Sequence, residues 1–409
     1  MLLAAVLLLT GCSGSSNSSV SSGNLTPDDI FSGGKPDVDG YEVPSAMVDI
    51  TSQKLVSNIR IGWNLGYSLE ACISDLDGNT LPDATPPTGK VPVETLWGNP
   101  PASEQLFNAL VDSGINAVRI PITWRGHVDR EFNINEDWLN RVKQVVDYAY
   151  NCGMYVIITV YHDGAFDDDY GAWIRNAAKE PDITIEHYKC LWEQIADKFH
   201  AYNERLLYES MNEVEFYGYP EAEAYDLFNR LNQEFVNTIR SSNGNNLRRH
   251  LVIAGYNADI NSTCSSRFVM PDDPANKCIL SVHYYTPITF CRESIRNYWG
   301  IPSEQRWMEQ QIDTLKTQFV DKGIPVMITE YGAKGSDAAS RVFFCEKLVK
   351  LCRDSNIAAF LWDDGSELDR TTFEWRTPEL IEALKRASSG EDYTPKKLYE
   401  EPVQDADDF

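Results

Sequence analysis

Eight short, β-rich apolar runs recur along the chain, and they constrain its fold more than any other feature. Longer polar or helix-patterned stretches separate them. The runs are centred near Ile61, Val118, Ile157, Leu207, Ile253, Leu280, Met327 and Phe360. Continuous apolar strands are typical of parallel sheets buried on both faces. Strand followed by helix, repeated eight times over about 340 residues, predicts an α/β fold, a (β/α)8 TIM barrel. A doubly wound open sheet is the structural alternative.

The expected helices between these runs have recognisable ends. Asn135 is a good N-cap, two acidic residues follow it, and Gly153 lies just past the last apolar position of that helix. Residues 104–111, which follow Ser103, and residues 311–319 have a similar pattern. These signals support alternation of strand and helix along the whole barrel.

The first residues have the pattern of an export signal. Residues 1–9 form an apolar run far shorter than the ~20 residues that a membrane span needs. We therefore expect a signal peptide at 1–11. Leu-Thr-Gly-Cys, ending at Cys12, resembles the bacterial lipobox, which predicts lipidation of Cys12 and a lipoprotein of the outer membrane or cell surface. Ordinary secretion, with cleavage nearby, is the alternative.

The remaining chain divides into three expected segments. Residues 12–46 contain the Cys and a flexible Ser/Gly-rich tether, residues 47–388 the single barrel domain, and residues 389–409 an acidic C-terminal extension. No second domain is expected before the barrel, because the roughly 35 residues of the segment 12–46 are too few to form one. We expect a monomer whose contact with a membrane is made only through the lipid anchor.

Charge and cysteine usage narrow the class of protein further. The net charge of −25 argues against nucleic acid as a partner, because phosphate neutralisation needs clustered Lys and Arg. No CxxC or HExxH spacing is present, so we predict no metal and no cofactor. Eight cysteines besides Cys12 permit 105 pairings, and Cys264 with Cys278 is the most favoured local disulfide. The negative charge does not exclude a neutral substrate.

Polar side chains follow successive strands, at the end of a barrel where catalytic residues lie. The chemistry-bearing residues among them are Asn64, Arg119, His162, Asn212, Glu213, His283, Tyr285, Glu330 and Trp362. Two glutamates at separate strand ends suit glycoside hydrolysis, in which one carboxyl protonates the leaving oxygen and the other attacks the anomeric carbon. Each residue has a structural alternative, such as a helix cap, an ion pair or a core histidine. Because all of these residues are expected at the same end of the barrel, the catalytic interpretation is favoured.

These segments together resemble glycoside hydrolase family 5, most closely its subfamily 4, the endoglucanase and xyloglucanase group. The resemblance covers residues 48–384 in the family's order. It is carried by GWNLGYSLEA (62–71), WGNP (97–100), NAVRIPITW (116–124), YVIITVYHD (155–163), LLYESMNE (206–213), SVHYYTP (281–287), GIPVMITEYGA (323–333) and FLWDDG (360–365). Departures occur at Tyr67, Ser68, Tyr161 and Val214, where the family usually has Asn, Thr, His and Pro.

The resemblance implies a role for each matching position. Glu213 is expected to be the general acid/base and Glu330 the nucleophile of a retaining double displacement. Arg119 is expected to keep the nucleophile ionised, Asn212 to contact the sugar 2-hydroxyl, and Trp362 to support the sugar. His283 and Tyr285 are expected to border the two carboxylates, and His162 to line the site. As an acid, Glu213 is expected to have a raised pKa.

The predicted activity is therefore retaining endo-β-1,4-glucan hydrolysis of a neutral plant polysaccharide. The alternatives are a xyloglucan-specific endoglucanase or a mixed-linkage glucanase or xylanase. A non-catalytic glycan-binding lipoprotein is less consistent with the two glutamates. Further tryptophans that could line the cleft are Trp97, Trp124, Trp173 and Trp299.

Overall fold

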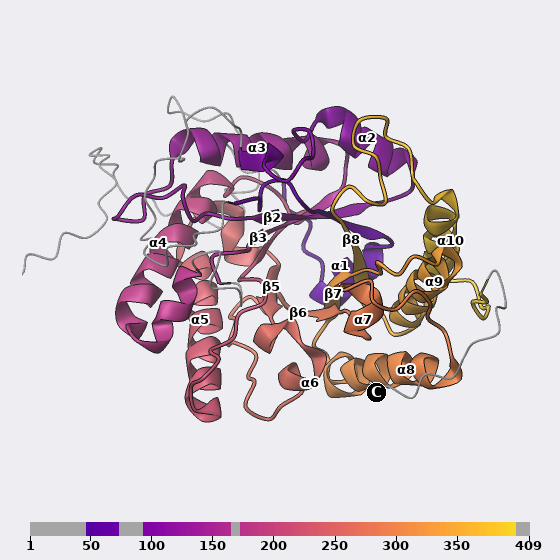
Figure 1. Ribbon diagram of the computed structural model, residues 1–409. Helices are drawn as coiled ribbons and strands as arrows, with labels where there is room; N and C mark the ends of the chain where they lie inside the picture. Colours follow the sequence, from indigo (N-terminus) through magenta and orange to yellow (C-terminus); the bar gives the residue numbers. More distant parts are fainter. Residues whose placement is uncertain (1–45, 73–92, 165–171, 398–409) are drawn as a thin grey trace, which may run out of the picture.

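The predicted (β/α)8 barrel is confirmed. A computed structural model describes residues 46–72, 93–164 and 172–397 (Figure 1). Eight parallel strands close in the order β1 to β8, with β8 pairing back to β1. The strands are β1 (Gly62–Leu65), β2 (Ala117–Ile122), β3 (Tyr155–Val160), β4 (Leu206–Glu209), β5 (Leu251–Ala254), β6 (Cys278–Tyr284), β7 (Val326–Tyr331) and β8 (Ala358–Asp363). Each contains the centre of a predicted run or lies within two residues of it.

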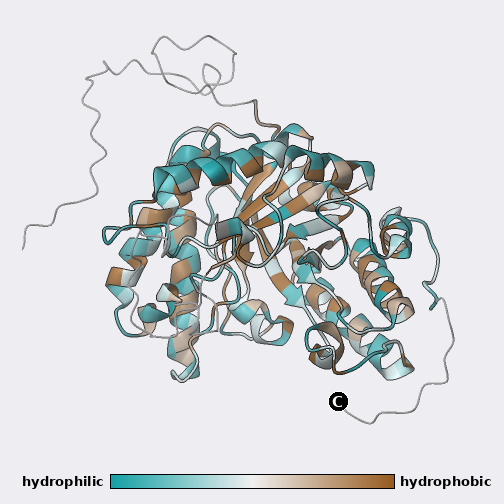
Figure 2. Ribbon diagram, turned by 45° about the horizontal axis from the view of Figure 1, so that its top comes forward, coloured by the Kyte–Doolittle hydropathy of each residue, from teal (hydrophilic) through white to brown (hydrophobic). Residues whose placement is uncertain are grey.

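Helices connect and surround the strands, and the first of them lies across the end of the barrel at which the strands begin. They are α1 (Ser52–Asn58), α2 (Glu104–Asp112), α3 (Glu136–Asn151), α4 (Pro181–Lys198), α5 (Glu221–Ser241), α6 (Ile260–Thr263), α7 (Ile288–Cys291), α8 (Pro302–Gln318), α9 (Ala338–Asp354) and α10 (Pro378–Ser388). Figure 2 shows apolar residues along the central strands and polar residues on the outward faces of the helices. None of the helices in the described ranges is long and apolar enough to cross a membrane.

The expected helix starts are confirmed where a polar cap supports them. Asn135 and Ser103 cap α3 and α2, each accepting a hydrogen bond from a backbone N–H in the first turn of its helix. The helix expected at 311–319 begins earlier, at Pro302, because proline suits a first helical position and apolar contacts continue along its length.

The predicted Cys264–Cys278 disulfide is wrong, because both residues are free cysteines. Cys264 closes the short helix α6, whereas Cys278 opens β6. The Cys278 thiol lies 3.6 Å from Asp273 Oδ2 and donates a hydrogen bond to it. Its sulfur is therefore engaged elsewhere.

The barrel interior has an apolar floor and a polar upper layer. Side chains from the strands form the floor with Leu55, Val56 and Ile59, which belong to α1 or directly follow it. This packing closes the end of the barrel at which the strands begin. Polar side chains fill the next layer, directly below the opposite end. The fold therefore concentrates its buried polar groups beneath the predicted site.

Candidate active site

A large open cleft of about 1240 Å³ lies at the carboxyl ends of the strands. It is lined by the predicted residues His162, Asn212, Glu213, His283, Tyr285, Glu330 and Trp362. Arg119 does not reach the cleft surface and is fully buried beneath it. The predicted residues therefore meet in one place, although they are far apart in the sequence. Cys12 lies outside the described residues.

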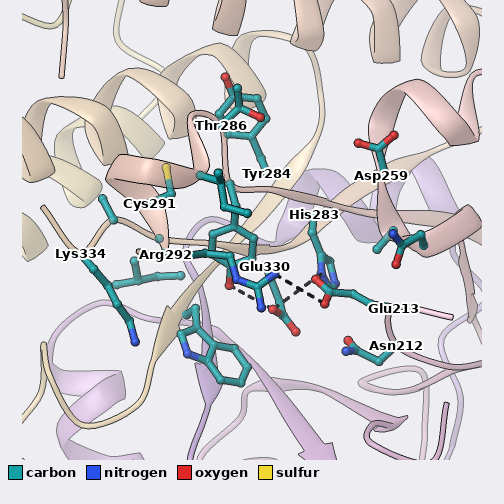
Figure 3. Close-up of a pocket in the computed structure, with 18 of the residues that line it drawn as sticks. Asn212, Glu213, Asp259, His283, Tyr284, Thr286, Cys291, Arg292, Glu330 and Lys334 are labelled. Carbon is teal, nitrogen blue, oxygen red and sulfur yellow. Dashed lines mark hydrogen bonds and ion pairs between the residues drawn. The ribbon is translucent and has the colours of Figure 1, made fainter. Parts of the chain in front are cut away.

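The two glutamates face each other across the floor of the cleft (Figure 3). Glu213 follows β4, and Glu330 lies in β7. One oxygen of each carboxylate and a ring nitrogen of His283 all lie within 4.8 Å of one another. His283 pairs with Glu330 across β6 and β7, beside a shift in strand register. Such irregularities change the direction of side chains, and here both point to the cleft.

Arg119 connects most of the site from below. Its Nη1 donates to Glu330 Oε1 at 2.6 Å and to Asn64 Oδ1 at 3.2 Å. Its Nη2 donates to Asn212 Oδ1 at 2.8 Å, and its Nε donates to a Glu209 oxygen. Burial acts to lower the pKa of Arg119, but Glu209 and Glu330 outweigh burial and raise it. The guanidinium is therefore a fixed positive charge beneath Glu330.

Glu209, the last residue of β4, is a component of the site that the sequence analysis did not identify. It is fully buried, and its second oxygen accepts a hydrogen bond from Ser281 Oγ at 2.7 Å. Side chains alternate along a strand, so Glu209 shares the inward direction of Leu207 in the barrel floor. Applying this period of two to β4 would have placed a second acid beside Arg119.

The expected raised pKa of Glu213 is wrong for the empty cleft. Burial does raise the pKa of Glu213, but the hydrogen bond and charge of His283 outweigh burial. Together with Arg292 and Arg119, they hold the pKa below its usual value. His283 Nδ1 lies 2.8 Å from Glu213 Oε1, and Arg292 Nη1 lies 3.8 Å from Glu213 Oε2. Glu213 is therefore held as a carboxylate.

Aromatic rings form the wall beside Glu330. The Tyr285 hydroxyl donates to Glu330 Oε2 at 3.0 Å. The Trp362 ring lies nearly parallel to that of Tyr161, with centroids 5.8 Å apart and an interplanar angle of 17°. Tyr161 also lies against the Arg119 guanidinium, at 5.6 Å from ring centroid to Cζ. Tyr161, noted only as a departure from the family pattern, therefore belongs to the centre of the site.

The other candidate tryptophans divide between cleft and core. Trp97 lines the cleft and meets the His162 ring edge-on, with centroids 5.6 Å apart. Trp124, Trp173 and Trp299 are buried, so the suggestion that they line the cleft is wrong. Large apolar rings that follow strands can fill the core just as well as a binding surface. Their sequence positions alone did not distinguish the two.

Two more carboxyl groups line the cleft, and both hold loops. Burial raises the pKa of Glu70 to about 7, although its carboxylate accepts backbone N–H bonds from Tyr67 and Ser68. Burial likewise raises the pKa of Glu367 to about 7, and its carboxylate lies 3.6 Å from Arg341. These contacts fix local chain conformation, so we do not assign either group to the chemistry.

The catalytic cluster also has the composition of a cation site, with an imidazole and two carboxylates close together. We do not assign Glu213, His283 and Glu330 as metal ligands. Arg119 already supplies a positive charge beside Glu330, and Tyr285 donates to its other oxygen. The absence of a metal or cofactor from the reaction stays a prediction.

A (β/α)8 barrel with two facing carboxylates at its mouth, one of them held by a buried arginine, has the architecture of a glycoside hydrolase. Residues 83–367 match the cellulase family, glycosyl hydrolase family 5. The chain therefore belongs to glycoside hydrolase family 5.

Individual relatives agree with this assignment. The chain is 34% identical over 376 residues to the cellulase/esterase CelE of Acetivibrio thermocellus, covering 87% of this chain but only 43% of that protein. A broad-specificity endoglucanase from Ruminococcus champanellensis with bound cellotriose is 31% identical, with a TM-score of 0.74 and coverage of 83% and 99%. A family 5 xyloglucanase from Paenibacillus pabuli is 31% identical, with a TM-score of 0.73 and coverage of 82% and 100%.

Glu209→Gln tests the buried network directly. We expect the free energy of unfolding to fall by about 3 kcal/mol, because the substitution removes one of the two charges that compensate Arg119. Urea denaturation at pH 7 measures the change. Asp182→Asn is the matched control, since its ion pair with Arg230 is exposed and is worth less than about 1 kcal/mol. Equal effects of the two substitutions would show that the network does not stabilise the barrel.

Proposed function

We propose that this protein is a retaining endo-β-1,4-glucanase that cleaves a neutral β-glucan by double displacement. The observation that carries the proposal is the close approach of Glu213 and Glu330, with one oxygen of each within 4.8 Å. Retaining enzymes place their carboxyl groups about 5–5.5 Å apart, whereas inverting enzymes leave roughly 6.5–9.5 Å for a water molecule. The separation supports direct attack by a carboxylate.

In the first step, the Glu330 carboxylate attacks the anomeric carbon while Glu213 gives its proton to the glycosidic oxygen. The carbon–oxygen bond breaks, the shortened glucan leaves with the proton, and a glycosyl ester forms on Glu330. In the second step, Glu213 takes a proton from water, and the resulting hydroxide oxygen attacks the same carbon and releases Glu330. Glu213 ends protonated, ready for another cycle.

Supporting roles follow from the contacts of each side chain. Arg119 and Tyr285 together bind both oxygens of Glu330, which favours the ionised nucleophile. The Arg119 bond to Asn212 Oδ1 leaves the amide N–H groups of that residue available for a sugar hydroxyl. Trp362 supplies an aromatic surface on which a sugar ring can stack, and His162 extends the cleft wall.

The substrate class rests on the relatives and on the shape of the site. One solved relative holds cellotriose, and another is a xyloglucanase. The cleft is large and open, as internal cleavage of a chain requires. Xyloglucan specificity is the leading alternative, followed by mixed-linkage glucan and xylan. A purely glycan-binding role is less consistent with a complete acid, nucleophile and buried arginine.

Azide separates the two catalytic roles. In Glu330→Ala, we expect hydrolysis to fall by a factor on the order of 10⁴ or more, because no nucleophile remains. Azide added with an activated aryl cello-oligosaccharide should then give the α-glycosyl azide. In Glu213→Ala, the glycosyl-enzyme still forms, and azide should give the β-glycosyl azide. NMR of the products decides the assignment, and the opposite stereochemistry would exchange the two roles.

A polysaccharide panel tests the substrate. We expect internal cuts in barley-type mixed-linkage glucan, carboxymethyl cellulose or xyloglucan, because their β-1,4-linked glucose units fit a cleft with an aromatic surface. Xylan and mannan complete the panel, and the sizes of early products show whether cleavage is internal. Cleavage confined to mannan would contradict the glucanase assignment.

We also propose that the protein is exported and lipidated at Cys12, as its first residues indicate. Expression in a bacterial host with radiolabelled palmitate should give a labelled protein in the membrane fraction. Cys12→Ser should lose the label and leave the membrane fraction, because no thiol remains to carry the lipid. Label retained by Cys12→Ser would contradict lipidation at this position, and unlabelled wild type in the medium would favour ordinary secretion.

A further inference from the structure

Arg292 lies in the cleft beside the carboxylate that we assign as acid/base. It directly follows α7, and Figure 3 shows its guanidinium near Glu213 and Glu330. Its Nη1 lies 3.8 Å from Glu213 Oε2, and its Cζ lies 5.3 Å from the centre of the Tyr285 ring. The side chain is 53% exposed, in contrast to the fully buried Arg119.

The backbone that carries Arg292 is held in place, although its side chain is not. Phe290 and Cys291 are buried, and the carbonyl of Phe290 accepts hydrogen bonds from the amides of Lys334 and Gly335. The position of the Arg292 backbone is therefore fixed relative to β7. The guanidinium, in contrast, is half exposed, so it can turn toward solvent without leaving a buried charge behind.

The two oxygens of Glu213 have different surroundings. Oε1 is bound to His283, so Oε2 is the oxygen with which Glu213 can protonate a glycosidic oxygen. Proton transfer requires the glycosidic oxygen to approach within about 2.6–3.2 Å of Oε2. The sugar on the leaving-group side must then occupy space beside Oε2, where the Arg292 guanidinium lies. The sugar and the Arg292 guanidinium therefore compete for the space beside Oε2.

We propose that Arg292 is the counter-ion of Glu213 in the empty cleft and that the sugar on the leaving-group side displaces its guanidinium when substrate binds. This inference rests on the proposed roles of Glu213 and Glu330. Arg292 is then a positioning residue, which acts through Glu213. Displacement removes a positive charge, and the sugar adds burial, so both changes favour the protonated Glu213 that the first step requires.

Other charged and titratable groups around Glu213 also contribute to its electrostatic environment. They come from every neighbouring element: Arg119 from β2, His283 from β6, Glu330 from β7, and Tyr161 and Tyr285 from the aromatic wall. All except Arg292 are largely buried, so substrate binding leaves their positions nearly unchanged. Arg292 is therefore the member of this set that a bound glucan can move.

Two pH profiles of Arg292→Gln test the proposal on cellohexaose. The kcat/KM profile reports the free enzyme, whereas the kcat profile reports the complex with substrate. Loss of the guanidinium raises the pKa of Glu213 in the empty cleft, so the basic limb of kcat/KM should move up by roughly half a pH unit. The basic limb of kcat should stay in place, because Arg292 has already left Glu213 in the complex.

Two further variants serve as controls. Arg292→Lys keeps a positive charge, so its kcat/KM limb should stay near that of wild type. Lys334→Gln removes a positive charge from the same cleft, but Lys334 pairs with Asp364 at 2.9 Å, so the limb should not move. Equal shifts of kcat and kcat/KM in Arg292→Gln would show that Arg292 stays on Glu213 in the complex. No shift in either profile would show that it is not the counter-ion.

Failure of the proposed function has a different signature. The leaving group of dinitrophenyl cellotrioside departs without help from an acid. The rate at which this substrate forms the glycosyl-enzyme should therefore be the same in wild type and in Arg292→Gln. Wild-type enzyme inactive on both substrates would contradict the proposed hydrolase activity. Activity on both, with unshifted limbs in the variant, would contradict only the role of Arg292.

Discussion

The buried guanidinium of Arg119 is the constraint on which the rest of the site depends. A charge removed from water is costly unless its hydrogen bonds are satisfied and opposite charge is close. Arg119 meets both requirements with Glu209 on one side and Glu330 on the other, and it also binds Asn64 and Asn212. Four strands or their following loops are thereby held at fixed positions, so the nucleophile has little freedom to move.

The two glutamates differ because their surroundings differ. Glu330 receives one bond from below and one from Tyr285, and both favour a charged nucleophile. Glu213 lies nearer the solvent, between His283 and an arginine whose side chain can move. A rigid environment suits a group that must keep one charge state during attack. An environment that can change when substrate binds suits a group that alternates between acid and base.

The sequence was sufficient for the fold and for most of the site, because both follow from short-range patterns. Each strand lies in a largely apolar run, and each catalytic candidate lies within such a run or just beyond it. Glu209, the last residue of β4, was missed because Asn212 and Glu213 just beyond it were taken as the polar residues of that strand end. The pKa of Glu213 depends first on His283, 70 residues away in the chain, and then on Arg292, and no local pattern specifies either contact. The prediction of a Cys264–Cys278 disulfide was wrong for a similar reason, since the Cys278 thiol donates to Asp273, a contact that no local pattern specifies.

The floor of the barrel has a consequence for how the enzyme meets its polymer. Leu55, Val56 and Ile59 close the end opposite the cleft, so the chain enters the domain from that side. The mouth of the cleft is thereby left to the segments that follow the strands. A long glucan can approach the two glutamates without crossing the segment at which the described chain begins. The apolar side chains that fill one end of the barrel thus keep the other end free for a polymer.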